Sequence, residues 1–249
     1  MMNINNLTVK KNEKTILNNL SANFEKGKIH IIMGPNGSGK STLSYTLAGH
    51  PDCIIQSGQI YYNEKDLTEM PIEERSLEGI YLAPQYPPVI EGLSHAAFLK
   101  ESINIRRKFK NLEPIDDFQF LKELRAIAKN FSFDEKQYPR QSLNQGFSGG
   151  EKKRNEILQI QLLQPDFIIL DEIDSGLDIE AMKKIADYIN NYKQENKTLI
   201  VITHYPNFAQ LLDVDFVHII KDGKVIAKDT KNIIEQIVEH GFGGIDESK

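Results

Sequence analysis

Nine consecutive residues in the N-terminal part of the chain have the types and the order of a phosphate-binding loop. They fit the pattern G-x-x-x-x-G-K-[ST] and are Gly34, Pro35, Asn36, Gly37, Ser38, Gly39, Lys40, Ser41 and Thr42. Glycines let the backbone N–H groups of such a loop turn toward phosphate oxygens, and the start of the following helix adds a favourable dipole. We expect Lys40 to reach the terminal phosphates and the Ser41 hydroxyl to bind Mg²⁺. The motif predicts a site for ATP with its magnesium ion.

Two adjacent acids could supply the rest of this chemistry. Asp171 and Glu172 directly follow the apolar run 167–170. We expect Asp171 to face the magnesium shell and Glu172 to orient or deprotonate an attacking water. Acids are common at the ends of strands, so the pair alone is ambiguous. The phosphate-binding loop in the same chain favours the catalytic interpretation.

A second glycine-rich segment lies between these two motifs. Ser148, Gly149, Gly150 and Glu151 precede a helical pattern that runs to residue 163. Such a segment predicts a helix N-terminus with exposed backbone N–H groups, which suits a γ-phosphate. Taken as an isolated string, it could equally be a helix cap with a flexible lead-in.

Short apolar runs bounded by turn residues must position these groups. They occupy residues 29–33, 79–83, 167–170, 199–202 and 216–220. Runs of four or five apolar residues without alternation are typical of strands that are buried on both faces of a parallel sheet. A helical pattern follows at 180–192, where apolar residues recur at three- and four-residue spacing. The alternation of strands and helices predicts an α/β fold.

Two regions depart from that alternation. Short β segments at 4–11 and 58–62 predict an antiparallel β flank, and the stretch 87–146 is helical in pattern. We therefore expect one domain over residues 1–249, in which an α/β core of 1–86 and 147–249 is interrupted by a helical subdomain at 87–146. Between the last two apolar runs, Asp222 and Gly223 predict a tight hairpin turn.

The composition limits the classes of partner and compartment. The chain has 30 basic and 35 acidic residues, which gives a formal net charge of −5. This acidic excess argues against a general nucleic-acid binder, because counterion release needs clustered positive charge. No apolar run approaches the roughly 18–20 residues that span a bilayer, and the first residues lack a secretory signal. With a single cysteine, Cys53, the chain is expected in the cytoplasm or an equivalent reducing organelle stroma.

The motifs, in this order, resemble those of the ATP-binding-cassette (ABC) ATPases over roughly residues 4–240. The resemblance also covers Gln85 after the run 79–83, Asp178 in the string Ser-Gly-Leu-Asp, and His204 after the run 199–202. It implies a P-loop NTPase fold of the ABC type and a Mg²⁺-dependent ATP hydrolase. The ligands that it implies for Mg²⁺ are Ser41, Gln85 and Asp171. The catalytic residues that it implies are Lys40, Gln85, Glu172 and His204.

The resemblance further implies a composite site. In this family the signature segment of one subunit, here Ser148 to Glu151, closes over the phosphate-binding loop of another subunit. It thus implies a transient, ATP-dependent, head-to-tail homodimer, in which Asp178 works across the interface. Simpler interpretations stay open for three residues: a surface amide for Gln85, a strand-end histidine for His204 and a helix N-cap for Asp178.

Two departures from the family pattern are visible. The aromatic residue that usually stacks on adenine near the first strand is absent, and its position falls near Lys11. We therefore expect weaker adenine contacts, made by aliphatic side chains such as Val9 or Ile16. In addition, Glu151 stands where many members of the family have glutamine.

Within the family, the strings at 146–159 and 171–179 closely resemble the SufC-type ATPases of the SUF iron–sulfur cluster assembly system. That resemblance implies SufB- and SufD-like scaffold partners, no direct insertion into a membrane and no nucleic-acid partner. Two alternatives stay open. One is the ATP-binding subunit of a membrane ABC transporter, and the other is a nucleotide-gated clamp that acts by binding alone.

Overall fold

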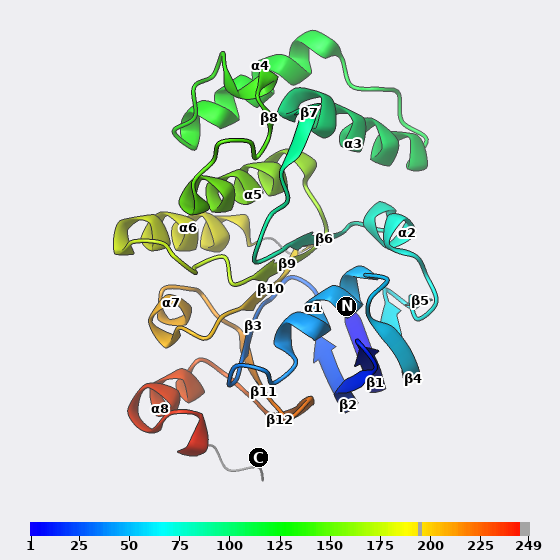
Figure 1. Ribbon diagram of the computed structural model, residues 1–249, viewed down its shortest axis with the longest axis vertical. Coiled ribbons are helices and arrows are strands. Elements are labelled where there is room, and N and C mark those ends of the chain that lie inside the picture. Colours follow the sequence, from blue (N-terminus) through cyan, green and yellow to red (C-terminus); the bar gives the residue numbers. More distant parts are fainter. Residues whose placement is uncertain (194–195, 245–249) are drawn as a thin grey trace. The chain divides into compact units, whose positions relative to one another are not determined.

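The computed structural model describes residues 1–193 and 196–244 (Figure 1). The chain folds as two compact units. The core unit is formed by Met1–Gln85 and by the described part of Asp166–Lys249, and the helical unit is formed by Tyr86–Pro165. No helix in the described part of the chain is long and apolar enough to cross a membrane.

A six-stranded, mainly parallel sheet forms the centre of the core unit. Its strand order is β12-β11-β3-β10-β9-β6, and only β12 runs antiparallel to its neighbour. The strands are β3 (Ile29–Met33), β6 (Ile80–Ala83), β9 (Phe167–Asp171), β10 (Thr198–Ile202), β11 (Phe216–Lys221) and β12 (Lys224–Asp229). Every residue of β3, β9 and β10 is buried, which is the reason that their sequences are mainly apolar and do not alternate with polar residues. The predicted α/β fold is confirmed.

The helices of the core unit follow its strands along the chain (Figure 1). They are α1 (Lys40–Ala48), α2 (Ile72–Leu77), α6 (Ile179–Tyr192), α7 (Pro206–Gln210) and α8 (Asn232–His240), with the short 3-10 helix η2 (Phe242–Gly244). The hairpin predicted between the last two strands is also present. Asp222 and Gly223 both have positive φ angles, 49° and 75°, as a two-residue turn of this kind requires.

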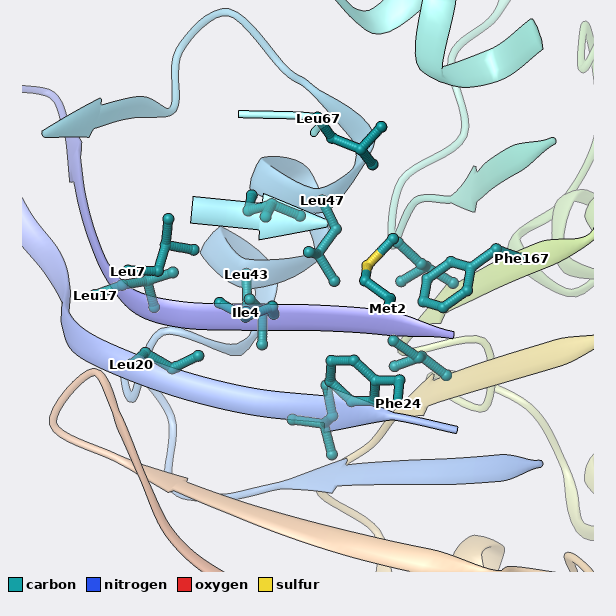
Figure 2. Close-up of a cluster of buried hydrophobic side chains, with 14 of the residues drawn as sticks. Met2, Ile4, Leu7, Leu17, Leu20, Phe24, Leu43, Leu47, Leu67 and Phe167 are labelled. Atoms are coloured by element: carbon teal, nitrogen blue, oxygen red, sulfur yellow. The ribbon is translucent and has the colours of Figure 1, made fainter. Parts of the chain in front are cut away.

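A second sheet, antiparallel, covers the N-terminal part of the core unit. Its strand order is β2-β1-β4-β5, and the strands are β1 (Met2–Lys11), β2 (Lys14–Phe24), β4 (Ile54–Tyr62) and β5 (Lys65–Asp66). Figure 2 shows side chains of this sheet, such as Met2 and Phe24, meeting those of α1 and Phe167 of β9. The ring centroids of Phe24 and Phe167 lie 6.5 Å apart in an edge-on arrangement. One apolar core therefore joins the two sheets and α1 and fixes the helix that follows the phosphate-binding loop.

The helical unit has an apolar core of its own. It contains β7 (Ile90–Ser94), α3 (His95–Phe109), α4 (Asp117–Asn130), the 3-10 helix η1 (Tyr138–Arg140), β8 (Ser142–Leu143) and α5 (Gly149–Leu163). Leu99, Phe120 and Tyr138 pack there against Leu158 of α5. Because α5 packs in this core, the unit extends to Pro165, whereas the sequence-based range for the insertion ended at residue 146.

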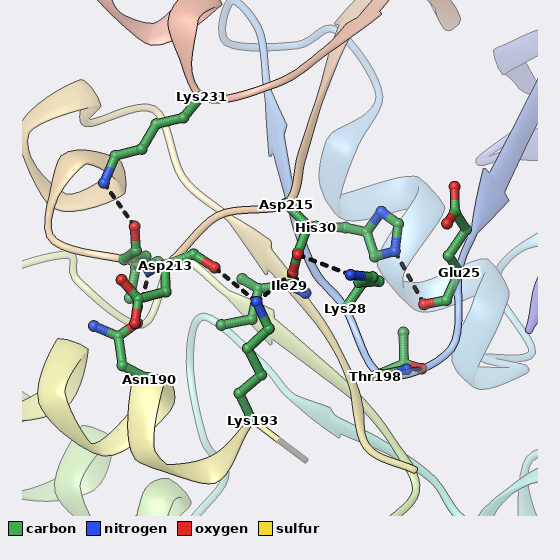
Figure 3. Close-up of polar contacts among 12 residues, drawn as sticks. Glu25, Lys28, Ile29, His30, Asn190, Lys193, Thr198, Asp213, Asp215 and Lys231 are labelled. Atoms are coloured by element: carbon green, nitrogen blue, oxygen red, sulfur yellow. Dashed lines mark hydrogen bonds and ion pairs between the residues drawn. The ribbon is translucent and has the colours of Figure 1, made fainter. Parts of the chain in front are cut away.

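A buried histidine pair lies between β3 and β11. His30 Nε2 is 3.2 Å from the Glu25 carbonyl (Figure 3). His30 Nδ1 is 3.1 Å from Nε2 of His218. Since a carbonyl can only accept, His30 Nε2 carries its proton and His30 Nδ1 accepts from His218. Burial, opposed by the Glu25 hydrogen bond, lowers the pKa of His30 to about 4, and burial together with the nearby His30 lowers the pKa of His218 to about 3. Both rings are neutral in the folded protein.

Next to this pair, a carboxylate ties two loops to the sheet. Asp215 Oδ1 lies 3.2 Å from Lys28 Nζ, and its Oδ2 lies 2.7 Å from Lys193 Nζ and accepts from the Ile29 N–H at 2.9 Å (Figure 3). Partial burial acts to raise the pKa of Asp215, but these hydrogen bonds outweigh it and the pKa is lowered.

Candidate functional site

The phosphate-binding loop lies between the end of β3 and the start of α1, as its motif predicts. Two of its glycines have backbone angles and surroundings that exclude a side chain. Gly34 has a φ of 154°, and a Cβ there would lie 2.0 Å from the Ile220 carbonyl oxygen. Gly39 has a φ of 106°, and a Cβ there would lie 2.8 Å from a methyl carbon of Leu17. The loop is thus held tightly against β11 and β2.

Lys40 is buried at the foot of this loop. Only 5% of it is exposed, and its ammonium group donates to the carbonyls of Gly34 and Pro35, each at 2.9 Å. Burial lowers the pKa of Lys40, while the nearby Glu172 and Asp171 oppose that shift. The hydroxyl of Ser38, in the same loop, is buried with no hydrogen-bond partner in the described structure. A charged donor and an unpaired hydroxyl in one loop suit an anionic ligand with many acceptor oxygens.

Asp171 is fully buried at the end of β9 and faces α1. Its Oδ1 accepts from the Ser41 hydroxyl at 3.4 Å, and its Oδ2 accepts from the Ser44 hydroxyl at 2.9 Å. Carboxylate and hydroxyl oxygens are the ligands that Mg²⁺ prefers, so Asp171 and Ser41 fit the ion expected beside the phosphates. Ser44 was not among the residues predicted from the sequence. Its signal is its place three residues after Ser41, which puts both hydroxyls on one face of the helix.

Three polar residues follow neighbouring parallel strands. Gln85 follows β6, Glu172 follows β9 and His204 follows β10, and the order β10-β9-β6 brings these strand ends to one edge of the sheet. Gln85 Nε2 donates to Glu172 Oε2, and His204 Nδ1 lies 3.3 Å from Glu172 Oε1. Glu172 has a φ of 50°, the left-handed region that costs a side-chain-bearing residue about 1 kcal/mol. Such a backbone persists where the surroundings fix it, and it is common at functional sites.

These residues line one cavity of about 520 Å³ within the core unit. Its walls are formed by Ile16, Asn36, Gly37, Gly39, Lys40, Ser41, Thr42, Gln85, Glu172 and His204. The predicted catalytic residues Lys40, Gln85, Glu172 and His204 therefore lie together.

The same cavity tests the two aliphatic contacts expected for adenine. Ile16 lines the cavity and is half-buried. Val9 is fully buried in the core of the unit, so the expectation that it contacts adenine is wrong. Lys11 stands near the position where the family usually has an aromatic residue, and its ammonium group lies 4.8 Å from the centre of the Tyr45 ring.

The signature segment begins α5 in the helical unit. The Ser148 hydroxyl accepts from the Glu151 N–H at 3.3 Å, and Glu151 Oε2 accepts from the Ser148 N–H at 2.8 Å. This reciprocal capping box satisfies one donor at each end of the first turn. Hydrogen bonds from Ser148 lower the pKa of Glu151. A Cβ at Gly149 would meet no atom within 4 Å, so the start of the helix is open to an approaching group.

Asp178 caps α6, where its Oδ1 accepts from the Ala181 N–H at 2.7 Å. The N-cap interpretation of this residue is thus confirmed. An N-cap carboxylate keeps a second oxygen, so this geometry leaves its expected role at a dimer interface as a prediction.

Comparison with known proteins identifies the family. Residues 17–175 match the model of the family described as "ABC transporter". The chain belongs to this family. It is therefore an ABC-type ATPase and binds nucleotide. Over their full lengths, the ATPase is 40% identical to an Escherichia coli (strain K12) protein named "Probable ATP-dependent transporter SufC".

Two further relatives extend the likeness. The ATPase is 42% identical to the "Probable ATP-dependent transporter slr0075" of Synechocystis, which covers 99% of this chain and 96% of the relative. It is 40% identical to "Vegetative protein 296" of Bacillus subtilis, which covers 97% of this chain and 92% of the relative. The chain thus closely resembles proteins of the SufC type over its whole length.

Solved structures support the fold. A dimeric post-hydrolysis ATP-binding cassette, MJ0796 bound to ADP and Pi, superposes with a TM-score of 0.76 at 24% identity and covers 93% of this chain and 99% of that one. A nucleotide-free cassette from an ABC transporter superposes with a TM-score of 0.77 at 22% identity and covers 100% and 98%. The ABC-type P-loop fold is confirmed.

Proposed function

We propose that this ATPase hydrolyses ATP with Mg²⁺ at the core-unit cavity and that the hydrolysis drives a soluble scaffold for iron–sulfur cluster assembly. One observation supports the proposed hydrolysis of ATP. The Glu172 carboxylate lines the same cavity as Lys40 and is contacted there by Gln85 and His204. A carboxylate that accepts a hydrogen bond from Gln85 and has an imidazole ring beside it is suited to orient a water molecule and to take its proton.

The residues divide the reaction among themselves. A water oriented by Glu172 attacks the γ-phosphorus, the bond from that phosphorus to the bridging oxygen of ADP breaks, and Glu172 accepts the proton of the water. Lys40 gives up its contacts with the Gly34 and Pro35 carbonyls and donates to the phosphate oxygens instead. His204, with its ring beside Glu172, donates to the γ-phosphate.

Asp171 and Ser41 would hold the magnesium ion, and Gln85 would complete its protein ligands. The ion would supply positive charge that neutralises the phosphates. For the second subunit of a head-to-tail dimer, we propose that Ser148, Gly149 and Gly150 contact the γ-phosphate. The open start of α5 supports this assignment, because a free helix N-terminus favours an anion. We further propose that Asp178 contributes its remaining oxygen at that interface.

The scaffold assignment rests on the relatives of the SufC type. We propose SufB- and SufD-like chains as partners, no nucleic-acid partner and a location in the cytoplasm or a reducing organelle stroma. Co-purification of the tagged chain from its native host tests this. SufB- and SufD-like chains in the pull-down are the expected result, and a multispanning permease as the main partner would overturn it.

Glu172→Gln tests the chemistry. We expect ATP turnover to fall by at least about 100-fold, because the general base is lost, while the Kd for ATP changes by less than about 3-fold. A dimer should persist on gel filtration with ATP. The control is Glu180→Gln, because Glu180 is exposed on α6 and forms a surface ion pair with Lys184. Full activity of Glu172→Gln would remove Glu172 from its role.

The same variant separates a motor from a clamp. If cells that carry only Glu172→Gln assembled iron–sulfur clusters as well as the wild type, binding of nucleotide alone would suffice. The proposed dependence on hydrolysis would then be wrong.

A further inference from the structure

The loop that carries His204 is held at Thr203 and Tyr205, the residues on either side of the histidine. Strand β10 ends at Ile202, and α7 begins only at Pro206. Between them, the Thr203 N–H donates to the Ile32 carbonyl at 3.2 Å. The next support comes from the Thr203 side chain, because its hydroxyl oxygen accepts from the Tyr205 N–H at 2.9 Å. That hydroxyl therefore ties together the two residues that flank His204.

The proton of the same hydroxyl goes to a second loop. Thr203 Oγ1 donates to Asp174 Oδ2 at 2.6 Å, and both residues are buried, with 0% of Thr203 and 2% of Asp174 exposed. Asp174 lies two residues after Glu172, in a turn closed by the Ser175 N–H and hydroxyl, which donate to the Glu172 carbonyl at 3.1 Å and 2.9 Å. A short hydrogen bond to a buried carboxylate is stronger than one between neutral groups.

The hydrogen bond between Thr203 and Asp174 joins the loop after β10 to the loop after β9, beyond the last hydrogen bond between the two strands. The sheet itself ends with the Glu172 N–H, which donates to the Ile202 carbonyl at 2.9 Å. Beyond that bond, Asp174 and Thr203 hold the Glu172 turn against the His204 loop. The other oxygen, Asp174 Oδ1, has no hydrogen-bond partner in the described structure. A buried oxygen left unpaired is costly, and such a cost is typically retained where it serves a function.

We propose that Asp174 is a positioning residue for ATP hydrolysis, which acts through the Thr203 hydroxyl to fix the His204 ring beside Glu172. The inference rests on the proposed roles of Glu172 and His204 and adds a residue that is not among those lining the cavity. The 3.3 Å between His204 Nδ1 and Glu172 Oε1 is the distance that this contact sets. A displacement of about 1 Å at a reacting group can cost up to about 100-fold in rate.

Four variants test the contact from both sides. Thr203→Val and Asp174→Ala remove it, and we expect each to lower kcat by about 10-fold or more while the KM for ATP changes by less than about 2-fold. Thr203→Ser keeps the hydroxyl, and Asp174→Asn keeps a carbonyl acceptor. Both conservative variants should retain kcat within about 3-fold of the wild type. If Thr203→Val fails to fold, the pair Asp174→Ala and Asp174→Asn makes the same comparison from the other partner.

Thr198→Val is the matched control. Thr198 is also buried, at the start of the strand β10 that Thr203 follows, and its hydroxyl accepts from the Gly27 N–H at 3.3 Å, away from the cavity. It should lose stability like any buried threonine but keep its kcat. A second readout does not depend on turnover. In ¹H–¹⁵N spectra of the six histidine rings, the His204 resonances can be assigned by their loss in His204→Ala. They should shift in Thr203→Val and not in Thr198→Val.

The outcomes separate this inference from the proposed function. Full activity of His204→Ala would refute the role of His204 itself. The positioning role alone would be refuted by a different result. In that case His204→Ala would be defective, whereas Thr203→Val and Asp174→Ala would keep the wild-type kcat and show no shift of the His204 resonances. An equal loss of kcat in Thr198→Val would also refute it, since the loss would then reflect damage to the strand.

Discussion

The buried pair His30 and His218 should make the fold sensitive to mild acid. Both rings are neutral when folded, and each nitrogen that faces the other ring is already used in the single hydrogen bond between them. Protonation of His30 at Nδ1 would replace the acceptor by a donor and set N–H against N–H. In the unfolded chain the same histidine takes up a proton near pH 6.5, as water-exposed imidazoles do.

The pKa values give the sign and size of the effect. The folded pKa values, about 4 for His30 and about 3 for His218, lie below the unfolded value, so the unfolded state binds more protons between about pH 6.5 and pH 4. The contribution is absent above about pH 7, and acidification destabilises the fold progressively below that. By pH 5 each histidine costs about 2 kcal/mol of unfolding free energy.

Urea unfolding from pH 7.5 to pH 5 measures this effect. The chain has no tryptophan, so far-UV circular dichroism is the suitable signal. His218→Gln keeps an amide near the position of Nε2 but cannot titrate. We expect its unfolding free energy to fall by about 2 kcal/mol less than that of the wild type over this range. His240→Gln, which removes an exposed histidine, is the control. A pH dependence of His218→Gln equal to that of the wild type would refute the reasoning.

Two further predictions concern buried and capping groups. Arg75 is 2% exposed and donates to five backbone carbonyls, among them those of Thr46 and Leu67. Arg75→Met should therefore lower the free energy of unfolding, measured in urea, by about 3 kcal/mol. A change below about 1 kcal/mol would contradict the role of these bonds. Ser148→Ala removes the capping box of α5 and should cost about 1 kcal/mol, seen as faster hydrogen exchange in the first turn of that helix, whereas unchanged exchange would show that Glu151 alone caps it.

Much of the site was predictable because its signals are local. The loop at Gly34–Lys40 has a spacing that only a phosphate-binding turn requires, and buried parallel strands read as apolar runs whose ends meet at one edge. Glu172 could be predicted at the site from its place beside Asp171, and His204 could be predicted there from the resemblance to the ABC family. Their contacts with each other and with Gln85 could not, because they depend on the rotamers that tertiary packing selects.

The parts that were missed depend on non-local packing. Strand β2 was not predicted, because its register against β1 shifts repeatedly and its buried residues Leu17, Leu20 and Phe24 lose the two-residue period of a strand. The helical unit reaches Pro165 because Leu158 of α5 packs in its core, a contact that the sequence pattern does not indicate. The burial of Val9 likewise reflects which face of β1 meets α1, which alternation alone does not specify.

The walls of the cavity bear on which nucleotides the enzyme can tell apart. Around the phosphates, the loop N–H groups, Lys40 and Ser41 offer directed donors. Among the described residues that line the cavity, the aliphatic Ile16 is the one suited to a flat base. An aliphatic contact has no hydrogen-bonding pattern with which to distinguish one purine from another. The enzyme should therefore discriminate sharply between triphosphate and monophosphate and only weakly between adenine and guanine. Its choice of ATP in the cell would follow from the abundance of ATP rather than from selection by the protein.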